Sequence, residues 1–324
     1  MQTVVLTHRI YEDGMRVLDG KVNIKITNNG NAHQIQEDLN DADGFILRIG
    51  FIDRETILAS RRLKVIARTG SGVDNIDVQT ASERGIPVVI VPGGNTRSVA
   101  EHALALIMAA SKDLLSCDSK TRAGDFNVRN RYKAFEVLGK TIGLVGCGNI
   151  GRELAKLAAA IGMKVSVFDP FIDANDIASL GYTYERKLDQ LLAKADIVSL
   201  HAPLTEETRA MIGKRELNLM KPSSVLINCA RGELVDEGAL AEALSVGRIQ
   251  SAAADVLVKE PFDTANPLFK LENFIATPHM AGLTRDAASR VTTMAAEGVL
   301  AILAGKRWPH VANKEVYEHP VWNR

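Results

Sequence analysis

The stretch GLVGCGNIGRELAK, residues 143–156, decides the fold of this chain. Its glycines Gly146, Gly148 and Gly151 have the spacing G-x-G-x-x-G. The apolar run TIGLV precedes them, a helical pattern follows them, and the run KVSVF then ends at Asp169. A strand, a tight turn, a helix, a second strand and an acidic residue about 20 residues after the first glycine form a βαβ unit.

Each part of this unit has a physical task in holding a dinucleotide. The first glycine allows the turn, the second lets the backbone approach a pyrophosphate, and the third lets the helix lie close to the strand. The N–H groups and the positive dipole end of the helix favour phosphate. We expect Asp169 to accept hydrogen bonds from the adenosine ribose, which favours NAD over NADP. The alternative is an empty domain of this fold in which Asp169 only caps a strand.

Length, charge and cysteine content restrict the classes of protein. A chain of 324 residues is long enough for two domains. Lys plus Arg and Asp plus Glu both number 39, giving a formal net charge of +0, which argues against nucleic acid or an anionic membrane as partner. The N-terminal residues lack a signal-peptide core, and the longest uncharged apolar run, 103–110, is less than half a membrane span. Three cysteines without a C-x-x-C pair favour a reducing compartment, so we expect a cytoplasmic protein.

Short β-rich runs alternate with helical patterns on both sides of a break at residues 92–95. This alternation predicts an α/β protein with two doubly wound parallel sheets. Two apolar-periodic segments, 96–123 and 284–304, are too long for ordinary crossovers, and we expect each to be one long helix.

Three polar residues follow apolar strands of the second half, where ligands bind in open α/β sheets. Arg231 follows SVLINCA, Glu260 comes shortly after SAAADVL, and His279 follows NFIATP. An arginine, a carboxylate and an imidazole at one sheet edge suggest an acidic substrate and a proton to be moved. Arg231 could instead be a solvated cap of its strand, and Glu260 could simply begin a turn. A polar histidine ring within the apolar run that ends at His279 favours a functional role for that residue. The other histidines lack metal-ligand spacing, so no metal is expected.

The motifs GCGNIG, VFDP, LHAPLTEETRAMI, LINCARGELVDE, AAADVLVKEP and TPHMAG together resemble those of the D-isomer-specific 2-hydroxyacid dehydrogenase family. The segment RTGSGVDNID near residue 70 is similar to the substrate loop of that family, and the resemblance covers about residues 40–312. It implies a Rossmann nucleotide domain, 98–285, inserted into a flavodoxin-like substrate domain made of 1–97 and 286–324. It also implies a homodimer that acts on a small 2-hydroxy or 2-keto acid.

The resemblance implies roles for individual residues. His279 would exchange a proton with the substrate oxygen, Glu260 would stabilise the imidazolium, and Arg231 would polarise the carbonyl. The implied cofactor-binding residues are Gly146, Gly148, Asn149, Ile150, Gly151, Asp169, His201, Ala202, Pro203, Thr208, Cys229, Ala230, Asp255, Ala281 and Gly282. The implied substrate-binding residues are Arg48, Arg68, Ser71, Gly72, Val73 and Asn95.

The identity of the substrate stays open at this stage. Arg48 and Arg68 resemble arginines of the phosphoglycerate dehydrogenase branch, where two cations suit a phosphate. The regulatory domain of many members of that branch has no counterpart in this sequence, which keeps glyoxylate and hydroxypyruvate open. A non-catalytic NAD sensor or corepressor is the alternative of another class, and the Arg231, Glu260 and His279 set argues against it. Oxidation of Cys147 or Cys229 could block the cofactor site, and tight packing of small residues is the simpler reading.

Overall fold

The structure is a computed structural model that describes residues 1–27 and 32–323. Its chain divides into two compact units, each with its own parallel sheet. The first unit consists of Met1–Asn95 and Leu283–Arg324, and the second unit consists of Thr96–Gly282. Within the described residues, no helix is both long and apolar enough to span a bilayer.

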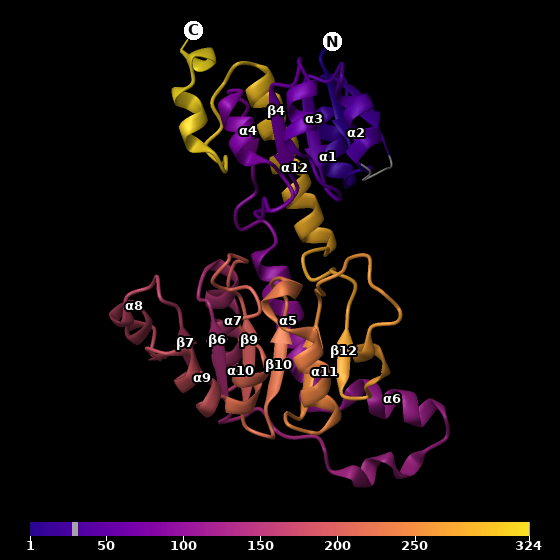
Figure 1. The fold of residues 1–324 in the computed structure, drawn as a ribbon, viewed down its shortest axis with the longest axis vertical. Helices are drawn as coiled ribbons and strands as arrows, with labels where there is room; N and C mark the ends of the chain where they lie inside the picture. The colour runs from indigo at the N-terminus through magenta and orange to yellow at the C-terminus, as the bar shows by residue number, and fades with distance from the viewer. Residues whose placement is uncertain (28–31, 324) are drawn as a thin grey trace. The chain divides into compact units, whose positions relative to one another are not determined.

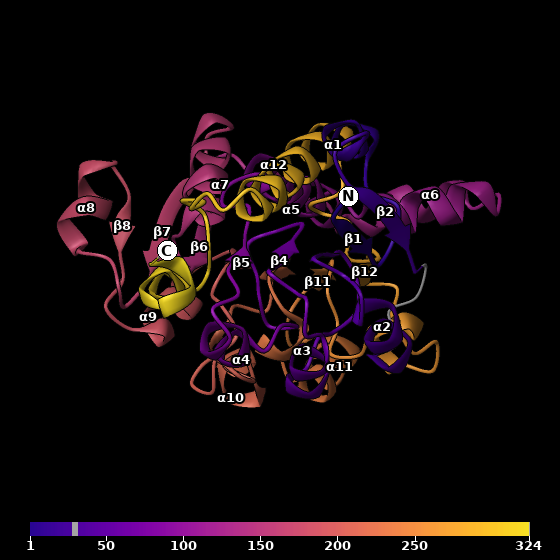
Figure 2. The ribbon, with the colours of Figure 1, turned by 90° about the horizontal axis from the view of Figure 1, so that it is seen from above.

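The first unit has a five-stranded sheet in the order β2-β1-β3-β4-β5, which is the flavodoxin-like order. Helices cover both of its faces, with α1 and α12 on one and α2, α3 and α4 on the other (Figure 2). The strands are β1 (Thr3–Leu6), β2 (Asn23–Ile26), β3 (Gly44–Leu47), β4 (Val65–Arg68) and β5 (Val88–Val89). The helices are α1 (Glu12–Leu18), α2 (Ala32–Leu39), α3 (Arg54–Ala59), α4 (Val78–Glu83) and α12 (Arg285–Leu303), with 3₁₀ turns η4 (Lys314–Glu318) and η5 (Pro320–Trp322) near the C-terminus.

The second unit has a seven-stranded parallel sheet in the order β12-β11-β10-β9-β6-β7-β8. Counted from β6, its first six strands follow the Rossmann order 3-2-1-4-5-6, and β12 extends the sheet at one edge. The strands are β6 (Thr141–Val145), β7 (Lys164–Phe168), β8 (Thr183–Tyr184), β9 (Ile197–Leu200), β10 (Val225–Asn228), β11 (Ser251–Ala254) and β12 (Phe274–Ala276). The helical elements are α5 (Thr96–Ser111), α6 (Leu114–Arg122), η1 (Phe126–Arg131), α7 (Asn149–Ala160), α8 (Ala174–Ser179), α9 (Leu188–Lys194), α10 (Lys214–Leu219), η2 (Gly232–Leu234), α11 (Glu237–Ser245) and η3 (Pro267–Lys270).

The predicted fold class, two doubly wound parallel sheets, is therefore confirmed (Figure 1). The helix predicted over 284–304 is also confirmed, since α12 begins after the N-cap Thr284 and ends at the C-cap Ala304. The single helix predicted over 96–123 is wrong. The chain leaves α5 after Ser111, and Asp113 takes a left-handed conformation with φ 50° before α6 begins.

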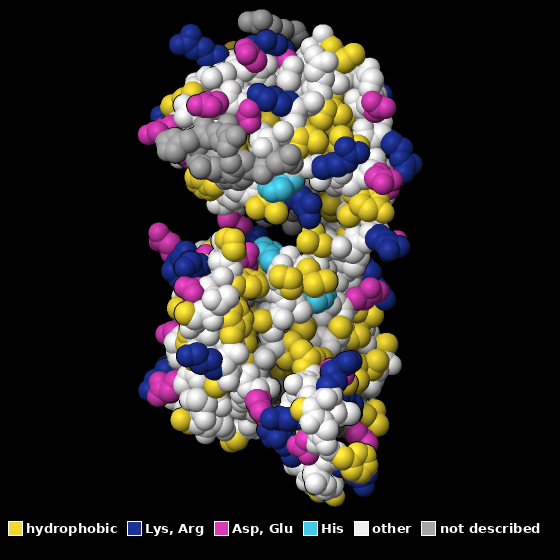
Figure 3. All heavy atoms as spheres, turned by 90° about the vertical axis from the view of Figure 1, so that its right-hand side faces the viewer, with side chains coloured by type: hydrophobic (Ala, Val, Ile, Leu, Met, Phe, Trp, Pro, Cys, Tyr) yellow, Lys and Arg dark blue, Asp and Glu magenta, His cyan; other side chains and the backbone are white. Residues whose placement is uncertain are grey.

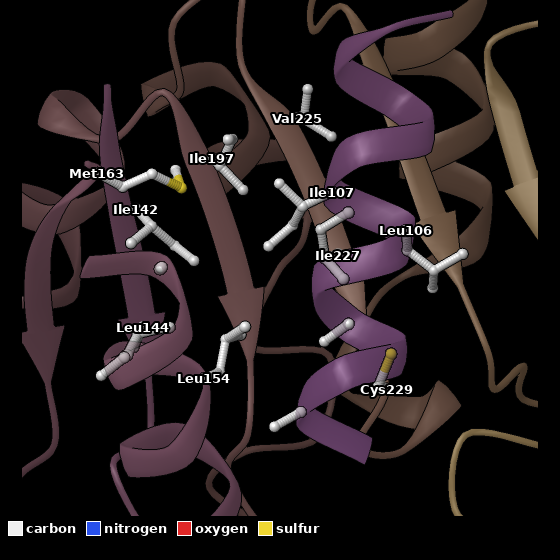
Figure 4. Close-up of a cluster of buried hydrophobic side chains, with 14 of the residues drawn as sticks. Leu106, Ile107, Ile142, Leu144, Leu154, Met163, Ile197, Val225, Ile227 and Cys229 are labelled. Atoms are coloured by element: carbon white, nitrogen blue, oxygen red, sulfur yellow. The ribbon is translucent and has the colours of Figure 1, made fainter. Parts of the chain in front are cut away.

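Long apolar side chains fill the core of the second unit. Leu106 and Ile107 of α5 lie near Ile227 and Cys229, while Leu154 of α7 faces the strands β6 and β9 (Figure 4). This packing fixes α7, and therefore the glycine turn that precedes it, against the sheet. On the face of the molecule seen in Figure 3, cationic and anionic side chains are interspersed, in keeping with the formal net charge of +0.

Candidate active site

The glycine turn leads directly from β6 into α7. Gly146 has φ 92°, and a Cβ there would lie 2.8 Å from the backbone N of Ala202. At Gly151 a Cβ would lie 2.5 Å from the carbonyl O of Gly146. At Gly148 a Cβ would meet no atom within 4 Å, so the space outside this residue is open. At Gly146 and Gly151 the protein's own backbone leaves no room for a side chain. At Gly148 the space beside the backbone is open, so a pyrophosphate can approach it, as a dinucleotide site requires.

Asp169 comes directly after β7 and is 9% exposed. Its carboxylate accepts the N–H of Cys147, in the glycine turn, at 2.8 Å and the N–H of Phe171 at 3.0 Å. The side chain therefore fixes the turn to the end of β7. A carboxylate has about four acceptor positions, so capacity remains for ribose hydroxyls.

The other residues expected near the cofactor begin α7 or follow the strands β9, β10, β11 and β12. Asn149 and Ile150 begin α7. His201 pairs with the Ser199 hydroxyl at 2.9 Å, and burial lowers the pKa of its ring to about 4, so it is neutral at pH 7. Burial also raises the pKa of the Cys229 thiol well above its usual range.

The Thr208 hydroxyl donates to the carbonyl O of Pro203 at 2.7 Å and accepts the N–H of Thr205 at 2.7 Å. These hydrogen bonds stabilise the turn that follows Ala202. The partners of the Thr208 hydroxyl thus lie within its own loop.

His279 and Glu260 are brought into contact. The His279 Nδ1 lies 2.6 Å from a Glu260 carboxylate oxygen, with side-chain exposures of 50% and 34%. The pair leaves Nε2 of the imidazole for a further partner. His279 has φ 50°, a conformation that non-glycine residues rarely adopt and that is often found at functional sites.

A buried carboxylate holds the segment that carries this histidine. Asp255, 1% exposed, follows β11 and accepts the Met280 N–H at 2.9 Å and the Ala281 N–H at 2.8 Å. It also accepts the Thr277 hydroxyl, and its carbonyl O accepts the His279 N–H at 2.8 Å. His102 of α5 lies 2.9 Å from the Thr277 hydroxyl. Asp255 therefore fixes residues on both sides of His279, and Gly282, the last residue of the second unit, follows this segment.

Arg231 comes three residues after β10 and is partly exposed. Asn228, at the end of the strand, donates to the Arg231 carbonyl O at 2.8 Å and accepts the Ala230 N–H at 3.0 Å. The next residue, Gly232, packs so closely that a Cβ there would lie 2.1 Å from the Leu257 carbonyl carbon. The Arg231 loop is thus pressed against the segment that leads to Glu260.

The residues expected to bind substrate lie in the first unit. Arg48 follows β3, Arg68 ends β4 and Asn95 ends the N-terminal segment of the unit. The Arg48 N–H donates to the Thr7 hydroxyl at 3.0 Å, which joins the ends of β1 and β3.

The predicted substrate loop, Ser71-Gly72-Val73, begins three residues after the end of β4 at Arg68. No hydrogen bond from these three N–H groups to another described residue is found, as an anion-binding turn requires.

Several residues of this site escaped prediction from sequence. His102, Thr277 and Glu237 act through partners far away in the chain, whereas Asn228 contacts Ala230 and Arg231 close by. Only Asn228 carries a local signal, because it is a polar residue closing the apolar strand VLIN. Over the described part of the chain, no group of three or more His, Cys, Asp or Glu could hold a metal ion.

The fold and the glycine turn define a two-unit α/β protein with a dinucleotide-binding Rossmann domain. Comparison with known proteins gives the family. Residues 104–281 match the family described as "D-isomer specific 2-hydroxyacid dehydrogenase, NAD binding domain". The chain belongs to the D-isomer specific 2-hydroxyacid dehydrogenase family, and its second unit contains the NAD-binding domain of that family.

Individual relatives agree with this assignment. A D-3-phosphoglycerate dehydrogenase of Methanocaldococcus jannaschii is 37% identical over 314 residues, covering 97% of this chain and 60% of the relative. A glyoxylate reductase of Korarchaeum cryptofilum is 38% identical, covering 87% of this chain and 86% of the relative. A solved structure from Thermus thermophilus has a TM-score of 0.90 at 33% identity, covering 96% of this chain and 100% of that one. The chain spans only about half to three fifths of the length of the D-3-phosphoglycerate dehydrogenases it matches.

Proposed function

We propose that this chain is an NAD-dependent oxidoreductase that interconverts a small D-2-hydroxy acid and the corresponding 2-keto acid. The observation that carries the proposal is the 2.6 Å contact between His279 and Glu260, in the same unit as the glycine turn. A carboxylate on Nδ1 stabilises the imidazolium and fixes the ring. The half-exposed imidazole can then use Nε2 as a general acid or base.

The residues of the chain divide the reaction between them. NADH supplies the hydride when it is bound. His279, as imidazolium, donates the Nε2 proton to the keto oxygen, and in the opposite direction it accepts the hydroxyl proton. Glu260 remains ionised and offsets the positive charge on the ring. The Arg231 guanidinium holds the substrate carboxylate or polarises the carbonyl by charge-assisted hydrogen bonds.

The first unit is proposed to bind the remainder of the substrate. The N–H groups of Ser71, Gly72 and Val73 suit a carboxylate, and Arg48 and Arg68 suit a phosphate or second carboxylate. The relatives named D-3-phosphoglycerate dehydrogenase favour a phosphorylated hydroxy acid, and the relatives named glyoxylate reductase favour a smaller substrate.

A panel of 2-keto acids assayed with NADH tests both the proposed activity and the proposed role of Arg48 in substrate binding. 3-Phosphohydroxypyruvate, hydroxypyruvate and glyoxylate differ in the group that the arginines would bind. Arg48→Ala is expected to raise KM for the phosphorylated acid about 10- to 100-fold, as expected for loss of a charge-assisted hydrogen bond, and to leave KM for glyoxylate nearly unchanged. Absence of turnover with every acid would refute the enzymatic proposal, and equal effects on all acids would refute the role of Arg48.

A homodimer formed through the segment of α6 and η1 is also proposed. This segment projects from the second unit (Figures 1 and 2). It carries exposed apolar side chains, among them Phe126 at 71% and Tyr132 at 88%. Exposed apolar patches of this kind mark protein contacts. Light scattering should show a dimer for the wild type and a monomer for the Phe126→Asp, Tyr132→Asp double variant, and a monomeric wild type would contradict the proposal.

We also propose a cytoplasmic location, because the cysteines form no disulfide bond. All three are free thiols, and Cys147 and Cys229 are buried without a bridging partner. Such thiols suit a reducing compartment.

A further inference from the structure

Glu237 makes two contacts that no local sequence pattern indicates. It is the first residue of α11 and follows Asp236, whose side chain caps the helix by accepting the Ala239 N–H. One oxygen of the Glu237 carboxylate accepts the Val258 N–H at 2.7 Å. The other oxygen accepts the Asn266 side-chain amide at 2.8 Å.

These two contacts lie on either side of Glu260. Val258 precedes it by two residues, and Asn266 stands at the start of η3, where its own side chain accepts the Leu268 N–H. One carboxylate therefore holds both ends of the loop 258–266, to which Glu260 belongs. Charge-assisted hydrogen bonds are about twice as strong as neutral ones, which suits a group that holds an exposed loop.

Asp263 holds the middle of the loop, where its carboxylate pairs with Lys259 at 3.1 Å and accepts the Ala265 N–H at 2.9 Å, but the Glu260 carboxylate itself has only a weak anchor besides His279. The Glu260 oxygen that faces away from His279 accepts the Leu257 N–H at 3.4 Å, a long hydrogen bond. Behind the loop, the close packing of Gly232 on the Leu257 backbone limits movement in one direction only. The contacts within the loop do not tie it to the rest of the second unit, and Glu237 supplies two contacts that do.

We propose that Glu237 is a positioning residue that sets the contact between Glu260 and His279. The inference rests on the proposed function, in which Glu260 stabilises the charged form of the His279 imidazole. Misplacement of a catalytic group by about 1 Å can lower a rate roughly 100-fold. Loss of the Glu237 carboxylate removes the hydrogen bonds at both ends of the loop 258–266. Glu260 and His279 are then out of contact for part of the time.

Three variants of the full chain test the inference. Glu237→Ala removes both contacts and should lower kcat about 10- to 100-fold, with an unchanged Kd for NADH. Glu237→Gln keeps one acceptor for the Val258 N–H and should retain most of the activity. The matched control is Glu242→Ala on the same helix, where the carboxylate pairs with the exposed Lys214 at 2.8 Å, and it should equal the wild type.

A double-variant cycle separates positioning from a general structural role. If Glu237 acts through Glu260, Glu237→Ala should lower kcat little further when Glu260→Ala is already present. Additive effects of the two substitutions on kcat would overturn the inference.

Hydrogen exchange keeps this test separate from the proposed function. Amides of residues 257–266 should exchange faster in Glu237→Ala than in Glu242→Ala, whatever the substrate of the enzyme. A wild-type chain that reduces no 2-keto acid would refute the proposed function, and exchange would still decide whether Glu237 holds the loop. Equal exchange in the two variants would overturn the inference even in an active enzyme.

Discussion

The half-buried imidazole of His201 lowers the stability of the folded chain as the pH falls. Burial lowers the pKa of His201 to about 4 in the folded chain, against 6.5 for the free side chain. Between these two values the unfolded chain binds a proton that the folded chain does not, so stability decreases as the pH falls from 6.5 towards 4. At 1.36 kcal/mol per pKa unit, the loss between pH 8 and pH 5 is about 2 kcal/mol.

Comparison with His201→Asn isolates this contribution. Other groups also titrate between pH 8 and pH 5, but they do so equally in the variant, and the difference in pH dependence belongs to residue 201. His310→Asn, which removes an exposed histidine, is the matched control. We expect the wild type to lose about 2 kcal/mol more than His201→Asn on going from pH 8 to pH 5.

The choice of probe follows from the position of the tryptophans. Trp308 and Trp322 both belong to the first unit, so their fluorescence reports that unit. Hydrogen exchange of β9 and β6 amides reports the second unit, which contains His201. The pH effect should appear in the exchange data and not in the fluorescence transition. An identical pH dependence of wild type and His201→Asn in exchange would refute the reasoning.

Two further predictions concern the cofactor turn and the thiols. Gly151→Ala places a Cβ 2.5 Å from the Gly146 carbonyl O and should abolish measurable NADH binding by calorimetry, and unaltered affinity would contradict the close packing. Burial raises the pKa of the Cys147 and Cys229 thiols, so at pH 7.5 only Cys117, which is partly exposed, should react with iodoacetamide within minutes, as peptide mapping would show. Rapid modification of Cys229 would contradict this.

Sequence was sufficient where the determinants are local. The glycine spacing and the acid at the end of KVSVF predicted the βαβ unit, because each requirement falls within one short segment. Strand and helix alternation predicted both sheets for the same reason. The exception is the break at Asp113, since no glycine or proline marks the end of α5, and a single aspartate in the left-handed region leaves little local signal.

Less of the candidate site could be predicted from the sequence, because its geometry depends on contacts between segments that are far apart in the chain. The contact between His279 and Glu260 could be anticipated from their places after two strands and from the family resemblance. The anchoring roles of Asp255 and Glu237 could not, since each carboxylate meets backbone N–H groups 20 or more residues away. Asp255 was expected to bind the cofactor, and that role stays a prediction beside its observed hydrogen bonds to the N–H groups of Met280 and Ala281.

The central claim is that His279, supported by Glu260, transfers the proton in a reaction coupled to NADH. Steady-state reduction of 2-keto acids by the wild type and by His279→Asn, with the Kd for NADH measured in parallel, tests it most directly. We expect kcat to be lower by roughly 10²- to 10⁴-fold in the variant, as for loss of a general acid, with the Kd for NADH nearly unchanged. Equal turnover in the two proteins would contradict it.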